Sequence, residues 1–491
     1  MKKIFKNLIY ILIILAFSAN LFAVEFSKEL FDKLAGAKNK IPTIEIPEYE
    51  RVQLDNGMVF YISKDTTLPI VEIKGYIKFG KMNETIETAG YSSVMLDIMN
   101  TATKKFSETE LIDFKELNGL EISFNANNDY YTISANSLSE DLEVLFEALA
   151  SELIEPQFEG SHFDRIVKEY LQSIGQSYTT EDGLLNMYYS INVFGKDHPY
   201  SFSDNLELLY ANISSLTPEK LRDFYYKTIS PNRIIISIAG NFEIDNVKEL
   251  IRKYFAKWEN TASSKPLFVY DSSLKTTSKI VIVDRQDSTQ AKIKMGYRFP
   301  NFEFFKDKLY DRVAFLMANR IYGSGAFKSR LMKVLRTEKG YVYGINSSFS
   351  TGSYLGNFYV TTTVRYDAIA DLIKDVKKIM EDIKYYKEPL TSEELFNEVN
   401  LYNALFPNAY KDKITVLDSV AFDVEIRKIN ENYINEFIKM YNSLSAEDVQ
   451  KAFSRFTYPN NFVTIIVGNK EKIIENLENN GIKDYEVIEN K

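Results

Sequence analysis

The sequence predicts an α+β fold made of two tandem, homologous lobes, each a mostly antiparallel sheet covered by helices. Two observations predict it: one segment pattern occurs twice, and short β-branched apolar runs alternate with helical patterns in each copy. The chain has 491 residues, enough for roughly two to four domains. Apolar residues make up 45% and charged residues 26%, a balance typical of a globular protein with a large core.

An internal repeat organises the chain. Residues 216–241 (LTPEKLRDFYYKTISPNRIIISIAGN) align without a gap to residues 444–469 (LSAEDVQKAFSRFTYPNNFVTIIVGN), at an offset of 228. In each copy a Thr or Ser N-cap precedes a helix, Pro-Asn ends that helix, and an apolar run follows. Each copy therefore predicts a helix followed by a buried strand, which Gly-Asn ends.

The repeat sets the expected domain boundaries. Its offset places 280–284 (IVIVD) over 52–56 (VQLDN), and both segments are expected to open a lobe with a strand. We expect the first lobe at 45–260, the second at 275–485, and a polar linker at 261–274. In the first lobe the patterns predict strands at 52–63, 70–79, 122–125 and 131–136, and helices at 89–99, 108–117, 141–153 and 163–176.

The N-terminal 23 residues have the pattern of a secretory signal peptide. Three lysines precede an apolar run at 8–17, and Ala23 offers a cleavage point. An uncleaved anchor is the alternative, but the run is short for a bilayer span. We expect signal peptide 1–23 to be removed, leaving a periplasmic or extracellular protein that is not an integral membrane protein.

Composition excludes several classes of site. There are no cysteines, which excludes disulfides, thiolate metal sites and cysteine nucleophiles. The formal net charge of −9 repels phosphate backbones, so we expect no nucleic-acid partner. His162 and His198 are the only histidines, and no second His lies near either. Both are expected to be structural, with His198 fixing a turn before Pro199.

Several motifs together resemble half of a pitrilysin/insulinase-type zinc peptidase. LDNG at 54–57 and HPY at 198–200 each match that family weakly when taken alone, and the helix–Pro–strand–Gly repeat matches its lobe-closing unit. The run SRL at 329–331 followed by LRTEKGYVY at 335–343 is the most specific match. The resemblance covers nearly the whole mature chain and implies half of a clamshell. It also implies a first-lobe helix with HxxEH, whose His side chains bind zinc and whose Glu is the general base.

On the equivalent helix of this chain the zinc motif is degenerate. The resemblance puts Ser93 and Asp97 in the two His places and Leu96 in the Glu place. The third ligand position falls near Ser173, with Glu169 one turn away. Serine is a poor zinc ligand, leucine cannot take a proton, and one carboxylate does not make a tight site. We therefore expect no metal and no catalytic residue of its own on this chain.

The second lobe keeps a different part of the family's machinery. Arg336 and Tyr343 match the Arg and Tyr that bind substrate and stabilise the tetrahedral intermediate. Without the motif they would be a helix-end arginine and a core aromatic. Gly323-Ser-Gly325 resembles a substrate-contacting glycine segment, or is a turn that needs positive φ. The strand at 130–136 could accept an extended peptide by β-addition.

These features favour a function in which this chain binds no zinc of its own. By resemblance to two-subunit enzymes such as the mitochondrial processing peptidase type, we expect a non-catalytic subunit of a heterodimeric, exported zinc metallopeptidase. Arg336 and Tyr343 would bind an extended peptide substrate and stabilise the transition state at the zinc of an HxxEH-bearing partner subunit. The alternative is a peptide-binding or structural scaffold without peptidase activity. An autonomous hydrolase is disfavoured, because no GxSxG or supported SxxK motif occurs.

Overall fold

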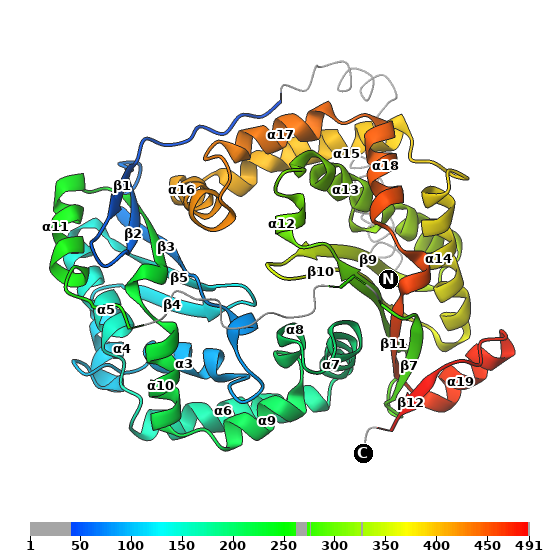
Figure 1. The fold of residues 1–491 in the computed structure, drawn as a ribbon, viewed down its shortest axis with the longest axis horizontal. Coiled ribbons are helices and arrows are strands. Elements are labelled where there is room, and N and C mark those ends of the chain that lie inside the picture. The colour runs from blue at the N-terminus through cyan, green and yellow to red at the C-terminus, as the bar shows by residue number, and fades with distance from the viewer. Residues whose placement is uncertain (1–40, 262–272, 275, 326–327, 490–491) are drawn as a thin grey trace, which may run out of the picture. The chain divides into compact units, whose positions relative to one another are not determined.

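The computed structural model describes residues 41–261, 273–274, 276–325 and 328–489 (Figure 1). Residues 43–491 form one unit, which contains two lobes, each built on a six-stranded sheet. The expected signal peptide, 1–23, lies outside the described residues, as does most of the expected linker at 261–274. None of the described helices is both long enough and apolar enough to cross a membrane.

The first sheet has the order β1-β2-β6-β3-β5-β4, and only the β2–β6 pairing is parallel. The central strand β6 is buried along its whole length, as its continuous β-branched run predicts. By contrast, β3 and β5 alternate between buried and more exposed residues. The strands are β1 (Glu50–Gln53), β2 (Val59–Lys64), β3 (Ile70–Ile77), β4 (Glu121–Ala126), β5 (Tyr131–Leu138) and β6 (Ile234–Gly240).

The second sheet repeats this plan. Its order is β12-β7-β11-β8-β10-β9, with the β12–β7 and β7–β11 pairings parallel and the others antiparallel. The apolar strand β11 is again fully buried. The strands are β7 (Lys279–Asp284), β8 (Ala291–Phe299), β9 (Val342–Thr351), β10 (Gly356–Val364), β11 (Val463–Gly468) and β12 (Glu486–Ile488). Two homologous lobes with mostly antiparallel sheets are therefore confirmed.

Strand register corrects one predicted equivalence. β6 and β11 correspond at an offset of 228, since each ends a copy of the repeat. Ile236 of β6 pairs with Phe60, whereas Thr464 of β11 pairs with Ile280. The partner of β11 therefore lies 220 residues after the partner of β6. The counterpart of 280–284 is β2, not 52–56, because the second lobe has eight more residues between these paired strands than the first.

Helices from both halves of the chain cover the two sheets. Those of the first half are α3 (Tyr91–Met99), α4 (Glu108–Leu117), α5 (Leu142–Ile154), α6 (Ser161–Tyr178), α7 (Glu181–Phe194), α8 (Pro199–Phe202), α9 (Leu206–Ser214), α10 (Pro218–Thr228) and α11 (Ile244–Phe255). Those of the second half are α12 (Phe302–Phe305), α13 (Leu309–Asn319), α14 (Ile369–Lys384), α15 (Ser392–Leu405), α16 (Lys413–Phe422), α17 (Tyr433–Ser443), α18 (Ala446–Phe456) and α19 (Lys470–Asn479).

The two repeat helices, α10 and α18, begin as their sequences predict. The Thr217 hydroxyl accepts a hydrogen bond from the Lys220 N–H at 3.3 Å. Ser445 does the same with Asp448 at 3.1 Å, and the Asp448 carboxylate accepts from the Ser445 N–H in return. Both helices pack their apolar faces into the core of their own lobe.

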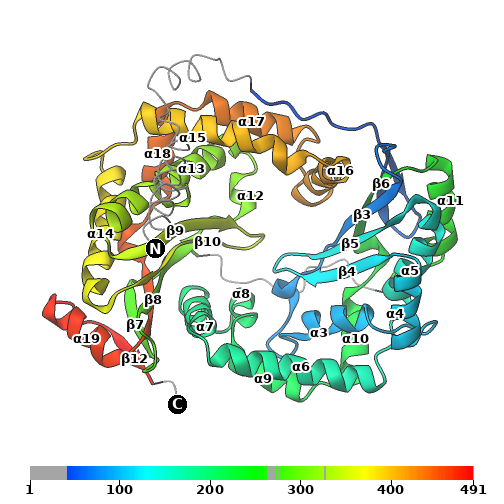
Figure 2. The same cartoon turned by 180° about the vertical axis from the view of Figure 1, so that it is seen from behind.

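The lobes exchange one helix each. In each lobe, one face of the sheet is covered by a helix from the other half of the chain. Helix α16 packs on β6, β3 and β2, where Leu417 and Val420 join Val59 and Tyr61 in one apolar cluster. Helix α7 packs on β11 and β8 of the second sheet. Figure 1 and its reverse view, Figure 2, show α16 near the strands of the first lobe and α7 near those of the second.

Candidate functional site

Helix α3 contains Ser93, Leu96 and Asp97, the residues that the resemblance puts in the places of the zinc motif. It starts after Gly90, where the buried Glu84 carboxylate accepts hydrogen bonds from the N–H groups of Gly90 (3.1 Å) and Ser92 (2.8 Å). Burial raises the pKa of Glu84, and these hydrogen bonds oppose that shift. On the helix, Leu96 has only 1% of its surface exposed and belongs to the first-lobe core. The residue in the place of the general base is therefore a packing residue.

Helix α6 lies against α3 and completes a small polar cluster of Ser93, Asp97 and Tyr170. The Tyr170 hydroxyl donates to Asp97 Oδ2 at 2.7 Å. Burial raises the pKa of Asp97, and the Tyr170 hydrogen bond opposes that shift. Ser173, in the third ligand place, is exposed, and its carbonyl accepts a hydrogen bond from the Ser177 hydroxyl at 3.0 Å.

This cluster does not fit a zinc ion. It offers hydroxyl groups and one carboxylate, whereas zinc sites use His, Cys, Asp or Glu donors. The nearby Glu169 carboxylate pairs with Arg165 at 3.0 Å. Across the residues that the structure describes, no group of three or more His, Asp or Glu side chains is placed to hold a metal ion.

Both histidines have structural environments. His162 is buried at the start of α6, and its Nε2 lies 2.8 Å from the Gln157 carbonyl oxygen. His198 precedes α8, where its Nδ1 accepts a hydrogen bond from the Tyr200 N–H at 3.1 Å. Its ring stacks on Phe194. The HPY segment therefore caps a short helix.

Tyr200 of the same segment connects the lobes. Its hydroxyl donates to Asp129 Oδ1 at 2.7 Å, in the turn between β4 and β5. Two residues of the turn between β9 and β10 meet the same groups: the Ser353 N–H donates to Asp129 Oδ1 (3.1 Å), and the Tyr354 N–H to the Tyr200 hydroxyl (3.3 Å). This role could not be predicted from the HPY motif, because the residues that Tyr200 contacts lie far away along the chain.

Arg336 and Tyr343 are brought together in the second lobe. Arg336 lies in the π-helical turn Met332–Glu338, and Tyr343 lies near the start of β9. Between them Gly340 has φ +65°, a left-handed conformation that lets the chain reverse. The Arg336 guanidinium carbon is 5.3 Å from the centre of the Tyr343 ring, and 91% of Tyr343 is exposed. Tyr343 is therefore not the core aromatic that its strand alone would suggest.

The predicted glycine segment lies beside this pair. Gly323, Gly325 and Gly344 help to line a cavity of about 380 Å³. Neither Gly323 nor Gly325 has a positive φ, so the prediction of a turn that needs positive φ at this segment is wrong. Close packing is the physical reason for glycine at 323, because an added Cβ would lie 2.5 Å from the Ser347 hydroxyl.

The sheet edges correct the predicted site of β-addition. β5, which contains most of the predicted segment 130–136, is paired on both sides, with β3 and β4. An extended peptide cannot pair with it without displacing a strand. The edge strands on this side of each sheet are β4 in the first lobe and β9, which carries Tyr343, in the second.

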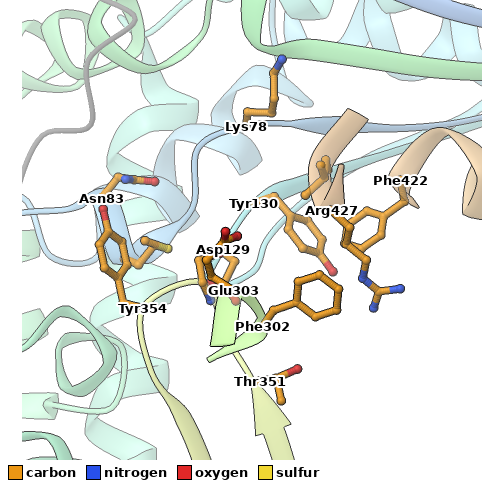
Figure 3. Close-up of a pocket in the computed structure, with 13 residues that line it drawn as sticks. Lys78, Asn83, Asp129, Tyr130, Phe302, Glu303, Thr351, Tyr354, Phe422 and Arg427 are labelled. Carbon is orange, nitrogen blue, oxygen red and sulfur yellow. The ribbon is translucent and has the colours of Figure 1, made fainter. Parts of the chain in front are cut away.

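The structure also contains a pocket between the lobes that the sequence did not reveal. Its volume is about 410 Å³, and Figure 3 shows aromatic rings and Arg427 gathered at one end. The lining residues come from both lobes: Lys78, Met82, Asn83, Asp129, Tyr130, Phe302, Glu303, Thr351, Ser353, Tyr354, Phe422, Ile426 and Arg427. They come from separate segments, so no local motif could reveal the site.

Comparison with family models shows which protein family this chain belongs to. Residues 59–198 match the model described as Insulinase (Peptidase family M16), and residues 215–401 match the Peptidase M16 inactive domain. Together the two matches span about two thirds of the chain. The chain belongs to peptidase family M16. Since it lacks HxxEH, it is an M16 member without the family's zinc motif.

Relatives in M16 include proteins named as proteases and one named as a non-peptidase. The uncharacterized zinc protease YmxG of Bacillus subtilis is 22% identical over 71% of this chain and 81% of its own length. The non-peptidase homolog YmxG of Helicobacter pylori is 21% identical over 72% of this chain and 82% of its own length.

Solved structures share the M16 fold. The peptidase M16 inactive domain from Pseudomonas fluorescens superposes with a TM-score of 0.75 at 18% identity, covering 86% of this chain and 98% of that one. The first half of the periplasmic protease PqqL from Escherichia coli gives a TM-score of 0.66 at 14% identity, covering 89% and 95%. At these identities the likeness shows the fold alone.

Proposed function

We propose that this M16 chain is the non-catalytic subunit of a heterodimeric, exported zinc metallopeptidase. The observation that carries the proposal is an asymmetry between the lobes. The first lobe has Leu96 in its core where the general base would stand, while the second presents Arg336 and an exposed Tyr343. A tyrosine with 91% of its surface exposed gains little from packing, so binding is the better explanation for it.

In this proposal a partner subunit supplies HxxEH and zinc. Arg336 donates hydrogen bonds to a peptide carbonyl, and the Tyr343 hydroxyl donates to the oxyanion that develops at the scissile carbon. The neighbouring edge strand β9 and the cavity beside Gly323 offer room for an extended peptide. The location outside the cytoplasm rests on the predicted signal peptide at 1–23.

The first test is a tagged pull-down of the mature chain from its own host, with peptidase activity assayed with and without a chelator. We expect an HxxEH-bearing chain to copurify with chelator-sensitive activity. Tyr343→Phe should then lower kcat by ~10- to 1,000-fold with little change in KM, because the lost hydroxyl acts mainly in the transition state. Arg336→Ala should lower kcat/KM without dissociating the complex.

Tyr385→Phe is the matched control, since Tyr385 is an exposed tyrosine at the end of α14 in the same lobe. Full activity of the complex with both Arg336→Ala and Tyr343→Phe would contradict the proposed role. Recovery of an inert chain, alone or with itself, would favour the second candidate, a peptide-binding or structural scaffold. The unpaired edges of β4 and β9 are the observation that favours peptide binding in that case.

A further inference from the structure

The pocket between the lobes has two chemically different ends. At one end, Tyr130 and Phe422 pack edge to face with ring centres 5.1 Å apart, and Phe302 lies next to them (Figure 3). At the other end, Tyr354 points its hydroxyl toward Asn83. Its volume of about 410 Å³ is within the ~300–1,000 Å³ of ordinary small-ligand sites.

Arg427 provides a cation at the aromatic end. Its guanidinium carbon lies 4.8 Å from the ring centre of Phe422 and 5.2 Å from that of Phe302. Nη1 donates to Asp423 at 2.8 Å, which accounts for one side of the guanidinium. A guanidinium has five N–H donors, so Arg427 can bind a second acceptor without giving up this partner.

The Tyr130 hydroxyl lies at the same end. Figure 3 shows it directed toward Phe302 and Arg427. Burial raises the pKa of Tyr130 and so does the neighbouring Asp129, whereas Arg427 acts in the opposite direction. The phenol is therefore protonated at neutral pH and can donate a hydrogen bond.

Charged side chains of both signs surround this end of the pocket. The cations are Arg51, Lys78, Arg312, Arg427 and Lys428. The carboxylates are Asp423, Glu425 and Asp418. All three carboxylates are engaged: Asp423 by Arg427, Glu425 by Arg51 and Lys428, and Asp418 by the Tyr76 hydroxyl. Because these carboxylates already have partners, the remaining N–H groups of Arg427 can attract an anionic ligand.

Two acidic residues line the pocket but do not oppose that conclusion. Asp129 Oδ1 already accepts hydrogen bonds from Tyr200 and from the Ser353 N–H. Glu303 is exposed, and its carboxylate lies 3.8 Å from Lys306. Neither carboxylate contacts Arg427 at ion-pair distance in the part of the chain that the structure describes.

We propose that this pocket binds the carboxyl-terminal residue of a peptide that ends in an apolar or aromatic side chain. The α-carboxylate accepts hydrogen bonds from Arg427 and the Tyr130 hydroxyl, and the side chain packs against Phe302 and Phe422. The rest of the peptide leaves past Asp129. The inference deepens the proposed peptide-handling function and rests on it for the source of the ligand.

The test uses the purified mature chain alone and titrates it calorimetrically with three probes. N-acetylphenylalanine carries both the carboxylate and the peptide group, its amide lacks the charge, and 3-phenylpropanoate lacks the peptide group. We expect N-acetylphenylalanine to bind at least about tenfold more tightly than its amide, because charge-assisted hydrogen bonds are the stronger ones. Equal affinity for acid and amide, or no binding of either, would overturn the proposal. Equal affinity for 3-phenylpropanoate would overturn the peptide assignment.

Substitutions locate the site. Tyr130→Phe keeps the ring packing and removes one donor, so it should weaken N-acetylphenylalanine about tenfold while leaving its amide unchanged. Tyr385→Phe, in an exposed tyrosine at the end of α14 outside the pocket, is the matched control and should bind normally. Arg427→Gln should abolish the preference for the acid. Should that variant fail to fold because Asp423 loses its partner, Tyr130→Phe still decides the question.

These measurements need neither a partner nor zinc. Failure of the pull-down would leave the pocket result standing, and the pocket would then belong to a peptide-binding scaffold. Failure of the titration would leave the Arg336 and Tyr343 proposal untouched. The two proposals can therefore fail separately.

Discussion

At the scale of single residues, the burial of Leu96 argues against building a zinc motif on α3 by one or two substitutions. A glutamate there would place a carboxylate in the first-lobe core, where Leu96 is 1% exposed. The neighbouring Asp97 is held by Tyr170 from α6. The surroundings of Leu96 and Asp97 are therefore packing and hydrogen-bonding surfaces, which stabilise α3 against α6.

Leu96→Ala tests this interpretation. We expect it to lower the free energy of unfolding by about 2–5 kcal/mol, because it removes a buried side chain and leaves a cavity. Leu96→Glu, which introduces the glutamate that the resemblance leads one to expect there, should destabilise the chain at least as much. Urea unfolding followed by circular dichroism measures both. Leu117→Ala, in a residue with 86% exposure, is the control and should change stability by less than about 0.5 kcal/mol.

Asp418 predicts a pH dependence of stability. Burial raises the pKa of this carboxyl to about 6, although the Tyr76 hydroxyl and Lys74 act in the opposite direction. A raised folded-state pKa means that the contribution to stability is fully present below about pH 4 and is lost as pH rises through about 6. Asp418→Asn stays uncharged and should avoid this loss, which is roughly 2–3 kcal/mol.

Urea unfolding of wild type and Asp418→Asn from pH 4 to pH 7.5 measures the difference directly. The variant should gain stability relative to wild type across this range. Glu152, whose pKa burial raises to about 7 against the effect of Lys115, is present in both proteins and cancels in the comparison. Parallel stability curves for the two proteins would contradict the prediction.

At the scale of elements, the exchanged helices determine how each sheet is closed. Strands β6 and β11 are apolar on both faces, so each needs cover on both sides. The helices of its own lobe cover one face, and α16 or α7 from the other half covers the second. The hydrogen bonds of Tyr76 to Asp418 and of Arg51 to Glu425 add polar contacts around α16.

Leu417→Ala in α16 should therefore destabilise the first lobe as well as the second. We expect a loss of about 2–5 kcal/mol, since Leu417 is fully buried against Val59 and Tyr61. Leu405→Ala, at the exposed end of α15, is the matched control. Native-state hydrogen exchange should show faster exchange of the β2 and β6 amides in the Leu417→Ala variant. The Leu405→Ala variant should exchange these amides at the wild-type rate. Unchanged protection in those strands would show that α16 is not part of the first-lobe core.

At the scale of the whole molecule, this exchange makes the two homologous halves depend on each other. A fragment of residues 41–260 would lack α16 and expose one apolar face of its sheet. A fragment of residues 273–491 would lack α7 and expose the equivalent face. Exposed apolar faces of this kind lead to association or incomplete folding.

We therefore expect neither fragment to give a folded monomer alone and the two to form a one-to-one complex when produced together. Size-exclusion chromatography and near-ultraviolet circular dichroism measure this outcome. A fragment that is monomeric, cooperatively folded and free of dye-binding apolar surface on its own would contradict it. Full-length protein carried through the same procedure is the control.

Much of the fold could be predicted because its signals are local. The predicted helix at 108–117 coincides with α4, and the predicted strands at 122–125 and 131–136 lie within β4 and β5. Caps, turns and periodicity act within a few residues, so the sequence alone can reveal them. The equivalence of 52–56 with 280–284 failed because it depended on register across a sheet, which the loops decide.

The sequence by itself determined that there are two homologous lobes and that the HxxEH motif does not occur. Those properties depend on residue identity and spacing, which folding cannot change. Only the tertiary structure decided that Tyr343 is exposed over Arg336, that α7 and α16 are exchanged, and that Tyr130 and Arg427 share a pocket. Each of these unites segments that no local pattern links, because contacts between distant segments form only when the whole core packs.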